Sequence, residues 1–290
     1  MVMPAARLLV APPTRTLLPY GLLSVAQTPT DSDSIHWQNG IQFEPDTCER
    51  ARVTVTDCPA IPADKIPTDG PGLRGANPFT VYTMPVCSAP GFIDEARTRA
   101  VAALTSGEAR AIEREFWLGE FGVTPHLTVT GAAVTGSDGT VEQSSPTIIT
   151  GGPVTPVEGL ALLEEALSNC YGNEGVIHMS PGTLTTLYTN GSIYKDGARL
   201  RTPNSHLVAA GAGYPGTFPG QSDPGGSGVR WMFATGAVFM RRTEVTVPEA
   251  RPGGVLNRGN NSVFLVAERT YVLGWDCCHI AIPVRIASVG

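Results

Sequence analysis

Apolar residues recur at helical spacing through one long stretch of the chain, residues 92–118. The residues that share this spacing are Ile93, Ala96, Ala100, Leu104, Ala111 and Phe116. The pattern predicts a helix with one buried face, and at about 1.5 Å per residue it would extend roughly 40 Å. Ser106 and Gly107 offer an alternative, a break at which a second helix begins with its own capping box.

Two further helices have recognisable starts. Thr155 is suited to an N-cap, because Pro156 follows at the first helical position and Glu158 lies three residues after Thr155. We expect this helix to end at Gly172. A shorter helix is predicted to begin after Ser180 and to end at the turn formed by residues 190–191.

Most of the remaining chain has the composition of strands separated by turns. The predicted strands are residues 35–43, 79–84, 127–134, 145–150, 175–179, 206–210, 231–239, 243–247, 262–267 and 280–286. The 33 glycines and 25 prolines are scattered, which indicates many turns and long irregular connections. Residues 57–77 are rich in Pro, Gly and Asp and predict a long two-stranded loop. Such a ribbon must lie on another surface to be stable.

Composition and charge narrow the class of protein. The chain has 290 residues, 42% of them apolar and 16% charged, which is typical of an ordered protein with one or two domains. A net charge of −6 does not predict the basic face that sequence-specific nucleic-acid binding needs. The apolar run at residues 8–11 is too short for a signal peptide, and we expect a soluble protein made in the cytoplasm.

Six cysteines occur at irregular spacing. They are Cys48, Cys58, Cys87, Cys170, Cys277 and Cys278. This is too sparse for a secreted disulfide scaffold, so most are predicted to be buried thiols. Adjacent side chains on a strand point to opposite faces, and Cys277 and Cys278 are therefore not expected to form cross-links that hold an assembly together.

Residues 211–216 match the dinucleotide-binding pattern GxGxxG after a predicted strand. That pattern functions only where a helix begins, and Pro215 and Gly216 prevent a helix here. Residues 211–228 contain seven glycines and three prolines. We interpret them as a flexible loop that contributes little to the fold of one subunit.

Cysteine and histidine occur together at residues 277–279, but a structural zinc site needs a second pair of ligands that the sequence does not supply. These residues are interpreted as ordinary strand positions. The isolated histidines, His36, His126, His178 and His206, are interpreted as structural. No catalytic, cofactor-binding or metal-binding residue is predicted, and no cofactor.

Two glutamates of the long predicted helix are candidates for a catalytic pair. Glu113 and Glu115 are two positions apart, so their side chains diverge on a helix. They are predicted to be solvated or paired with Arg110 and Arg114. The sequence also contains no nucleophile elbow, P-loop or HExxH motif, and the protein is predicted not to be an enzyme.

Four stretches carry a resemblance to a known family: residues 111–125, residues 160–187, residues 231–247 and residues 260–286, the last containing Glu268 and Arg269 before a long strand. In order and apolar spacing they resemble the major capsid proteins of tailed bacteriophages, which have the Hong Kong 97-like fold. Residues 90–286 carry this resemblance, and the first 90 residues match in layout.

The resemblance implies an α+β protein in five parts. These are an N-terminal arm (residues 1–34), an extended β loop (35–87), a spine helix with peripheral domain (88–152), an axial domain (153–236) and the closing strands of the peripheral domain (237–290). It also implies a shell of hexamers and pentamers around double-stranded DNA, which would be contacted non-specifically. Assembly would occur in the host cytoplasm, without membrane contact, to give the capsid of a virion.

Two features of the sequence differ from some members of this family, and two other functions remain as alternatives. No helical scaffolding segment precedes the arm, so any scaffold is expected to be a separate protein, as are a portal and decoration proteins. Some relatives form lysine-to-asparagine cross-links. Because this chain has only two lysines, Lys65 and Lys195, such cross-links are not expected here. An encapsulin-like nanocompartment shell protein is an alternative with the same fold. A β-rich extracellular binding protein or hydrolase is an alternative of another class.

Overall fold

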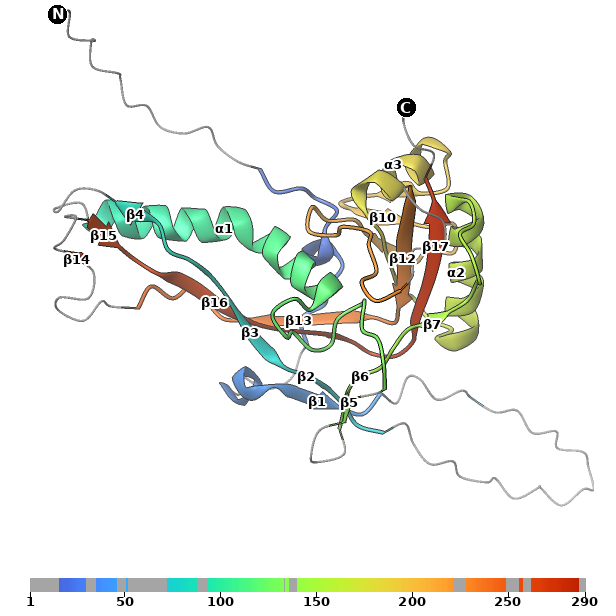
Figure 1. The fold of residues 1–290 in the computed structure, drawn as a ribbon, viewed down its shortest axis with the longest axis horizontal. Coiled ribbons are helices and arrows are strands. Elements are labelled where there is room, and N and C mark those ends of the chain that lie inside the picture. The colour runs from blue at the N-terminus through green and yellow to red at the C-terminus, as the bar shows by residue number, and fades with distance from the viewer. Residues whose placement is uncertain are drawn as a thin grey trace, which may run out of the picture.

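The protein is elongated and consists of a long helix on a narrow sheet, joined to a wider sheet that carries two shorter helices (Figure 1). The structure is a computed structural model. It describes residues 16–29, 35–45, 51, 72–87, 93–132, 134–135, 140–221, 228–248, 256–257 and 262–286. Helices and sheets of mixed direction make this an α+β fold, as predicted.

The long helix α1 (Ile93–Leu118) is continuous over 26 residues. The predicted helix is therefore confirmed, and the alternative break is wrong. The hydroxyls of Thr105 and Ser106 donate to carbonyls of the preceding turn, at 2.9 Å from Val101 O and 3.0 Å from Ala103 O. These side chains are thus accommodated within the helix instead of capping a new one.

The narrow sheet is antiparallel, in the order β13 (Val238–Arg242), β16 (Ala267–Trp275), β3 (Pro78–Thr83). The first half of α1 lies along this sheet (Figure 1). Small helix residues, Ala96 and Ala100, pack with Leu104 against Leu265 and Ala267. Because alanine side chains are short, the helix lies close to the strands.

The wider sheet has seven strands. Their order is β7 (Thr147–Ile148), β17 (His279–Arg285), β12 (Val229–Thr235), β8 (Val176–His178), β11 (Leu207–Ala209), β10 (Arg199–Arg201) and β9 (Tyr194–Asp196). Helices α2 (Pro156–Cys170) and α3 (Pro181–Thr189) pack on one face. The last turns of α1 and the short 3-10 helix η1 (Leu22–Ser24) pack on the other.

In the central strands β17, β12, β8 and β11 both faces of this sheet are buried, and side chains alternate between them. In β12, Trp231 and Phe233 lie in the cluster that contains the end of α1. Met232 and Ala234 lie in the cluster that contains α2 and α3. This explains why the predicted strands are continuous apolar runs instead of alternating ones.

The helix starts predicted from the sequence are confirmed. Thr155 Oγ1 accepts the Glu158 N–H at 3.3 Å. Ser180 Oγ accepts the Thr183 N–H at 3.4 Å. At the end of α2, Gly172 has φ +67°, a conformation that suits glycine after a helix.

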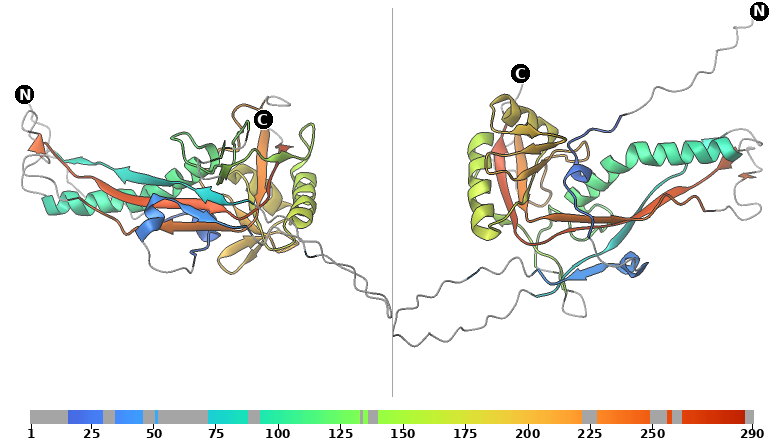
Figure 2. Two further views of the ribbon diagram at one scale, coloured as in Figure 1. Left: turned by 90° about the horizontal axis from the view of Figure 1, so that it is seen from below. Right: turned by 180° about the vertical axis from the view of Figure 1, so that it is seen from behind.

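Two small sheets complete the fold, and Figure 2 shows them from two other directions. One contains β1 (Ile41–Phe43), β2 (Arg74–Ala76), β6 (Val141–Gln143) and β5 (Val134–Thr135). The other contains β14 (Leu256–Asn257), β15 (Ser262–Phe264) and β4 (Val86–Cys87). Residues 46–50 and 52–71 of the predicted extended loop lie outside the described residues, as do residues 1–15 and 30–34 of the predicted arm.

Some predicted strands are wrong. Residues 127–132 form no strand, because the N–H groups of Leu127 and Thr128 donate instead to the terminal carbonyls of α1, Phe116 O and Trp117 O, at 2.9 and 3.0 Å. Unpaired carbonyls at a helix end need such donors. Residues 35–39 form the 3-10 helix η2 (Ile35–Asn39) before β1 begins.

Two other predicted strands differ in extent. Residues 231–239 are divided between β12 and β13. Residues 243–247 make only the single bridge from Thr246 to Glu268. By contrast, the predictions for β3, β8, β11 and β17 are confirmed within one or two residues.

Candidate functional site

The two parts of the fold meet where two chain segments cross from one sheet to the other. β12 continues into β13 through Gly236 and Ala237, and β16 continues into β17 through residues 276–278. The crossings are hydrogen-bonded together, from Gly236 N to Cys277 O at 2.6 Å and from Asp276 N to Ala237 O at 3.0 Å. A Cβ at Gly236 would lie 2.6 Å from that oxygen, so a side chain does not fit without a shift.

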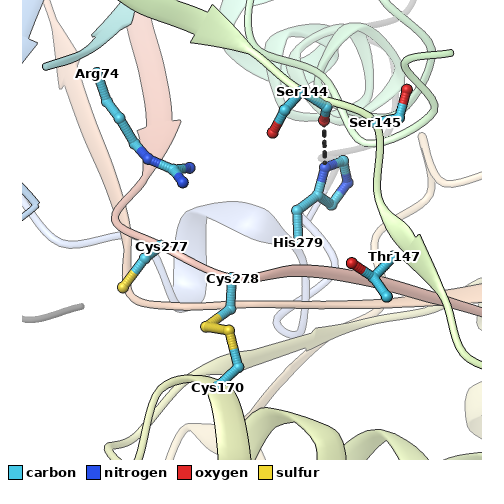
Figure 3. A pocket seen from close by; sticks show the side chains of 8 residues that line it. All are labelled: Arg74, Ser144, Ser145, Thr147, Cys170, Cys277, Cys278 and His279. Atoms are coloured by element: carbon cyan, nitrogen blue, oxygen red, sulfur yellow. Dashed lines mark hydrogen bonds between the residues drawn. A yellow bond between two sulfur atoms is a disulfide. The ribbon is translucent and has the colours of Figure 1, made fainter. Parts of the chain in front are cut away.

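A disulfide ties this junction to α2. Cys170, the last residue of α2, is bonded to Cys278, with an S–S distance of 2.00 Å and a Cα–Cα distance of 6.0 Å (Figure 3). Cys277 is also disulfide-bonded. The prediction of buried thiols is therefore wrong for these three cysteines.

The reason for the error is local backbone geometry. Cys278 has φ +60° and lies in the turn between β16 and β17. The alternation of side chains along a strand does not apply in such a turn. Since all three sulfurs are oxidised, none is a thiolate that could bind a metal. Among the described residues, no three His, Cys, Asp or Glu side chains are grouped as metal ligands.

His279 begins β17 beside the disulfide. Its Nδ1 lies 3.0 Å from Ser144 O and its Nε2 lies 2.9 Å from Leu127 O. A neutral imidazole has one N–H, so it donates to only one of these carbonyls. Burial, with smaller contributions from His126 and Arg74, lowers the pKa of His279 to about 4. The ring is therefore neutral near pH 7.

His178 lies in the core, fully enclosed, and its partners determine which ring nitrogen carries the proton. Thr235 donates its hydroxyl to Gly236 O at 3.0 Å. It therefore accepts from His178 Nε2 at 3.0 Å, and the Tyr214 hydroxyl donates to Nδ1 at 3.2 Å. Burial lowers the pKa of His178 to about 3. The network satisfies a neutral ring and connects β8, β12 and the loop after β11.

The other histidines are separated from one another. His206 Nδ1 accepts the Gly175 N–H at 3.2 Å and thereby joins two segments of the wider sheet. His126 packs against Gly119, where a Cβ would overlap its ring. His36 is exposed in η2. The structure does not bring these side chains together into one site.

The GxGxxG segment surrounds a buried carboxylate. Glu113 Oε1 accepts the Leu22 N–H at 3.1 Å, and Oε2 accepts the Gly213 N–H at 3.0 Å. A Cβ on Gly21 or Gly211 would overlap the carboxylate, so these positions require glycine for close approach. Glu113 therefore connects three segments: α1, the start of η1 and the loop after β11.

The predicted surroundings of the helix glutamates are wrong. Glu113 is 3% exposed, because the loop and η1 cover this face of α1. Glu115 is also buried and accepts the Phe121 N–H at 3.0 Å. Arg114 pairs instead with Glu120, at 2.6 Å. Burial is the main cause that raises the pKa of both Glu113 and Glu115, and the backbone hydrogen bonds partly oppose it.

Replacing Glu113 with glutamine tests this connection. The amide side chain would keep one acceptor oxygen but place an NH2 group against one of the two backbone N–H donors. We expect a loss of about 1–3 kcal/mol in the free energy of unfolding, the usual cost of an unsatisfied buried group. Urea denaturation measures it, with Glu120→Gln as the exposed control. Equal midpoints for Glu113→Gln and wild type would contradict the assignment.

The loop after β11 is not a flexible appendage over residues 211–221. Tyr214 and Phe218 are 2% and 5% exposed and belong to the main hydrophobic cluster. Trp117 Nε1 donates to Thr217 O at 2.7 Å, and Trp231 N donates to Gly216 O at 2.8 Å. The prediction that this loop contributes little to the fold is wrong for these residues. Residues 222–227 lie outside the described part of the chain.

A buried ion pair fixes α1 on the narrow sheet. Arg269 Nη1 lies 2.9 and 3.0 Å from the two carboxylate oxygens of Glu108. The Tyr271 hydroxyl donates to Glu108 Oε2 at 2.7 Å. Arg269 is one of the two residues, Glu268 and Arg269, on which the family resemblance partly depends. The sequence around Glu108 predicts a helix but does not predict that Glu108 pairs with Arg269.

Several large apolar side chains remain exposed on the single chain. The most exposed are Phe121 (89%), Ile35 (74%), Leu18 (66%), Tyr82 (64%), Tyr188 (52%) and Met84 (51%). Phe121 is held in the turn after α1 by the hydrogen bond from its N–H to Glu115. A rigidly positioned, exposed phenylalanine is a suitable anchor for a protein contact.

Comparisons with known proteins identify the fold. No protein-family model matches the chain, and no curated protein matches it. Among solved structures, the capsid of the empty GTA particle has a TM-score of 0.55 and 12% identity over 98% of this chain and 96% of that chain. The capsid of Ralstonia phage GP4 has a TM-score of 0.55 and 10% identity, over 99% and 96%.

A third structure with this fold is the holo-SrpI encapsulin complex from Synechococcus elongatus PCC 7942, with a TM-score of 0.56 and 10% identity over 99% of this chain and 95% of that chain. The chain therefore has the Hong Kong 97-like α+β fold predicted from its sequence. Within the described residues, no helix combines the length and apolar character needed to span a bilayer.

Proposed function

We propose that this chain is the major capsid protein of a tailed bacteriophage and that many copies form an icosahedral shell around double-stranded DNA. The observation that carries the proposal is the extent of the fold match. The structural alignment covers 98–99% of this chain and 95–96% of the matched chain in each of three shell structures. The proposed role is structural, not enzymatic.

The proposal gives each part of the chain a role. Residues 1–34 act as an arm and residues 35–87 as an extended loop that overlaps neighbouring subunits. Residues 88–152 and 237–290 form the peripheral domain, and residues 153–236 form the axial domain. The crossing at Gly236 and Ala237, where β12 passes into β13, supports the boundary at 236. Scaffold, portal and decoration proteins are proposed as separate partners.

Electron microscopy of the purified, assembled protein tests this function. We expect closed shells tens of nanometres across, because modest contacts repeated by symmetry stabilise a closed assembly. A protein that remains monomeric over a wide range of concentration and salt, with native circular dichroism, would contradict the proposal.

The encapsulin alternative predicts the same shells with different contents. It rests on the similarity to the SrpI complex, whose TM-score is close to those of the two capsids. Particles purified from infected or producing cells distinguish the two. Nuclease-resistant DNA of uniform length supports a phage capsid, whereas a single co-purifying protein and no DNA supports a nanocompartment.

Replacing Phe121 with serine is expected to impair assembly while preserving the subunit. Phe121 is almost fully exposed, so its loss removes no core contact within one chain. Anchors of this kind often contribute about 2 kcal/mol or more to a contact, roughly a thirtyfold change in association. Sedimentation velocity measures the fraction in shells. Glu120→Gln, in the same turn, is the control expected to assemble normally.

An unchanged assembled fraction for Phe121→Ser would exclude this side chain as an anchor but not the shell itself. Circular dichroism and thermal denaturation of the unassembled subunit are expected to match wild type. If they do not, the side chain has a role in the fold that its exposure does not reveal.

A further inference from the structure

A polar cavity of about 290 Å3 lies at the junction of the two parts of the fold (Figure 3). One water needs only about 15 Å3, so the cavity has room for a small ion with its hydration. The described residues that line it are Arg74, Ser144, Ser145, Thr147, Cys170, Cys277, Cys278 and His279. They come from β2, the segment before β7, the start of β7, the end of α2, the turn after β16 and the start of β17.

One cation, Arg74, is among the described residues that line the cavity. The Arg74 guanidinium makes no hydrogen bond or ion pair with any described residue, and no described lining residue is a carboxylate. Its main compensating charge is Asp276, which does not line the cavity. Burial lowers the pKa of Arg74, the result expected of a guanidinium that has lost water without gaining a close counter-ion.

Hydroxyl groups face the same space from the opposite side. The hydroxyls of Ser144 and Thr147 have no partner among the described residues, whereas Ser145 Oγ donates to Gly131 O at 2.8 Å. Figure 3 shows the side chains of Ser144 and Thr147 on the side of the cavity across from Arg74. Arg74, Ser144 and Thr147 therefore line one volume, and the side chains of all three can donate hydrogen bonds.

We propose that this cavity binds a tetrahedral oxyanion of the phosphate class, with Arg74 as the main ligand and Ser144 and Thr147 as further donors. A guanidinium matches two oxygens of such an ion. A planar carboxylate would be satisfied by the guanidinium alone, whereas donors on the opposite side suit the remaining oxygens of a tetrahedral ion. The phosphate is either a free ion or a DNA phosphodiester.

Isothermal titration calorimetry of the full chain with inorganic phosphate, without reducing agent, tests the proposal. We expect saturable binding that Arg74→Gln weakens by about tenfold or more, because hydrogen bonds to charged groups are the strong ones. Ser144→Ala combined with Thr147→Val is expected to weaken it about threefold or more. Arg199→Gln, an exposed arginine on β10, is the matched control and is expected to bind as wild type does.

The outcomes are decisive in either direction. Sulfate competing with phosphate, and acetate competing poorly, support the tetrahedral class. Equal competition by acetate overturns it. No saturable binding by wild type, or equal binding by Arg74→Gln, overturns the site. Should Arg74→Gln fail to fold, as judged by circular dichroism, the hydroxyl double variant decides.

A second titration with a short DNA duplex distinguishes the source of the phosphate. Weaker duplex binding by Arg74→Gln, relative to Arg199→Gln, identifies DNA phosphates as the ligand. Loss of phosphate binding with unchanged duplex binding identifies a free ion.

Discussion

Replacing both Cys170 and Cys278 with serine is expected to lower the free energy of unfolding by about 4–5 kcal/mol. The disulfide closes a sequence separation of 108 residues. In the chain-entropy model, a loop of this length loses about 4.7 kcal/mol of stabilisation when it is opened. The bond also joins α2 to the crossing between the two sheets, so its loss is expected to loosen that junction first. Urea denaturation under non-reducing conditions measures the change.

Dithiothreitol provides the matched comparison. It is expected to destabilise wild type more than the double substitution does, because Cys277 is disulfide-bonded as well. The double variant is therefore expected to retain part of its sensitivity to the reductant. A denaturation midpoint unchanged by the substitutions would contradict the stabilising role.

The Cys170–Cys278 bond lies within one chain, which separates subunit stability from shell integrity. We still predict that a reducing agent leaves assembled particles closed. The reason can no longer be that Cys170, Cys277 and Cys278 are free thiols, because all three are disulfide-bonded. We expect reduced particles to remain closed at room temperature and to lose heat resistance.

The elements predicted correctly are those whose signals are local. The helix that begins at Thr155 has its N-cap, its proline and its terminal glycine within its own sequence, and all three function as predicted. The continuous apolar runs of β8 and β11 reflect burial on both sheet faces. Such patterns are set by neighbours in the sequence, so they can be recognised without knowledge of the partners.

The wrong predictions depend on distant partners. Residues 127–132 have an apolar, strand-like composition, but the N–H groups of Leu127 and Thr128 donate to carbonyls at the end of α1. Glu113 has the sequence context of a solvated helix residue, yet its acceptors are needed 91 and 100 positions away, at Leu22 and Gly213. Nothing in the local pattern shows which segment will cover that face of the helix.

Glycines give the one sequence signal that points to the Glu113 site. In the sequence, Gly211 and Gly213 favour a flexible loop, whereas in the structure they permit close approach to a carboxylate and to α1. Gly21 approaches the same carboxylate from the other side. A cluster of glycines is therefore ambiguous: it indicates either freedom of the backbone or tight contact, and only the tertiary structure decides.

The stability of the subunit is expected to fall as the pH is lowered from 7 to 5. Burial lowers the pKa of His178 to about 3 and that of His279 to about 4, from 6.5 in the unfolded chain. Between the folded and unfolded pKa values, the unfolded state binds more protons than the folded state. The stability that the two neutral histidines contribute is therefore fully present above pH 6.5 and is lost as the pH falls toward the folded pKa values. At a pH of about 5 the loss is roughly 2 kcal/mol for each histidine.

Two buried carboxyls act in the opposite direction. The pKa values of Glu113 and Glu115 are raised in the folded state, so protonation on acidification favours folding through these groups. Their effect lies between the unfolded value of 4.5 and the raised folded pKa values, whereas the histidine effect begins near pH 6.5. The histidines therefore account for the loss of stability on acidification, and the two carboxyls oppose it.

Substitution of His178 by glutamine isolates one of the two histidines. The amide side chain can accept from the Tyr214 hydroxyl and donate to Thr235, and it does not titrate. The His178→Gln variant is expected to be less stable than wild type at neutral pH. Between about pH 7 and about pH 5 its free energy of unfolding is expected to fall by roughly 2 kcal/mol less than that of wild type, because only one histidine held neutral in the core remains. Urea denaturation at closely spaced pH values measures the slope, with the exposed His36→Gln as the matched control. Parallel slopes for His178→Gln and His36→Gln would show that His178 is not held neutral in the core.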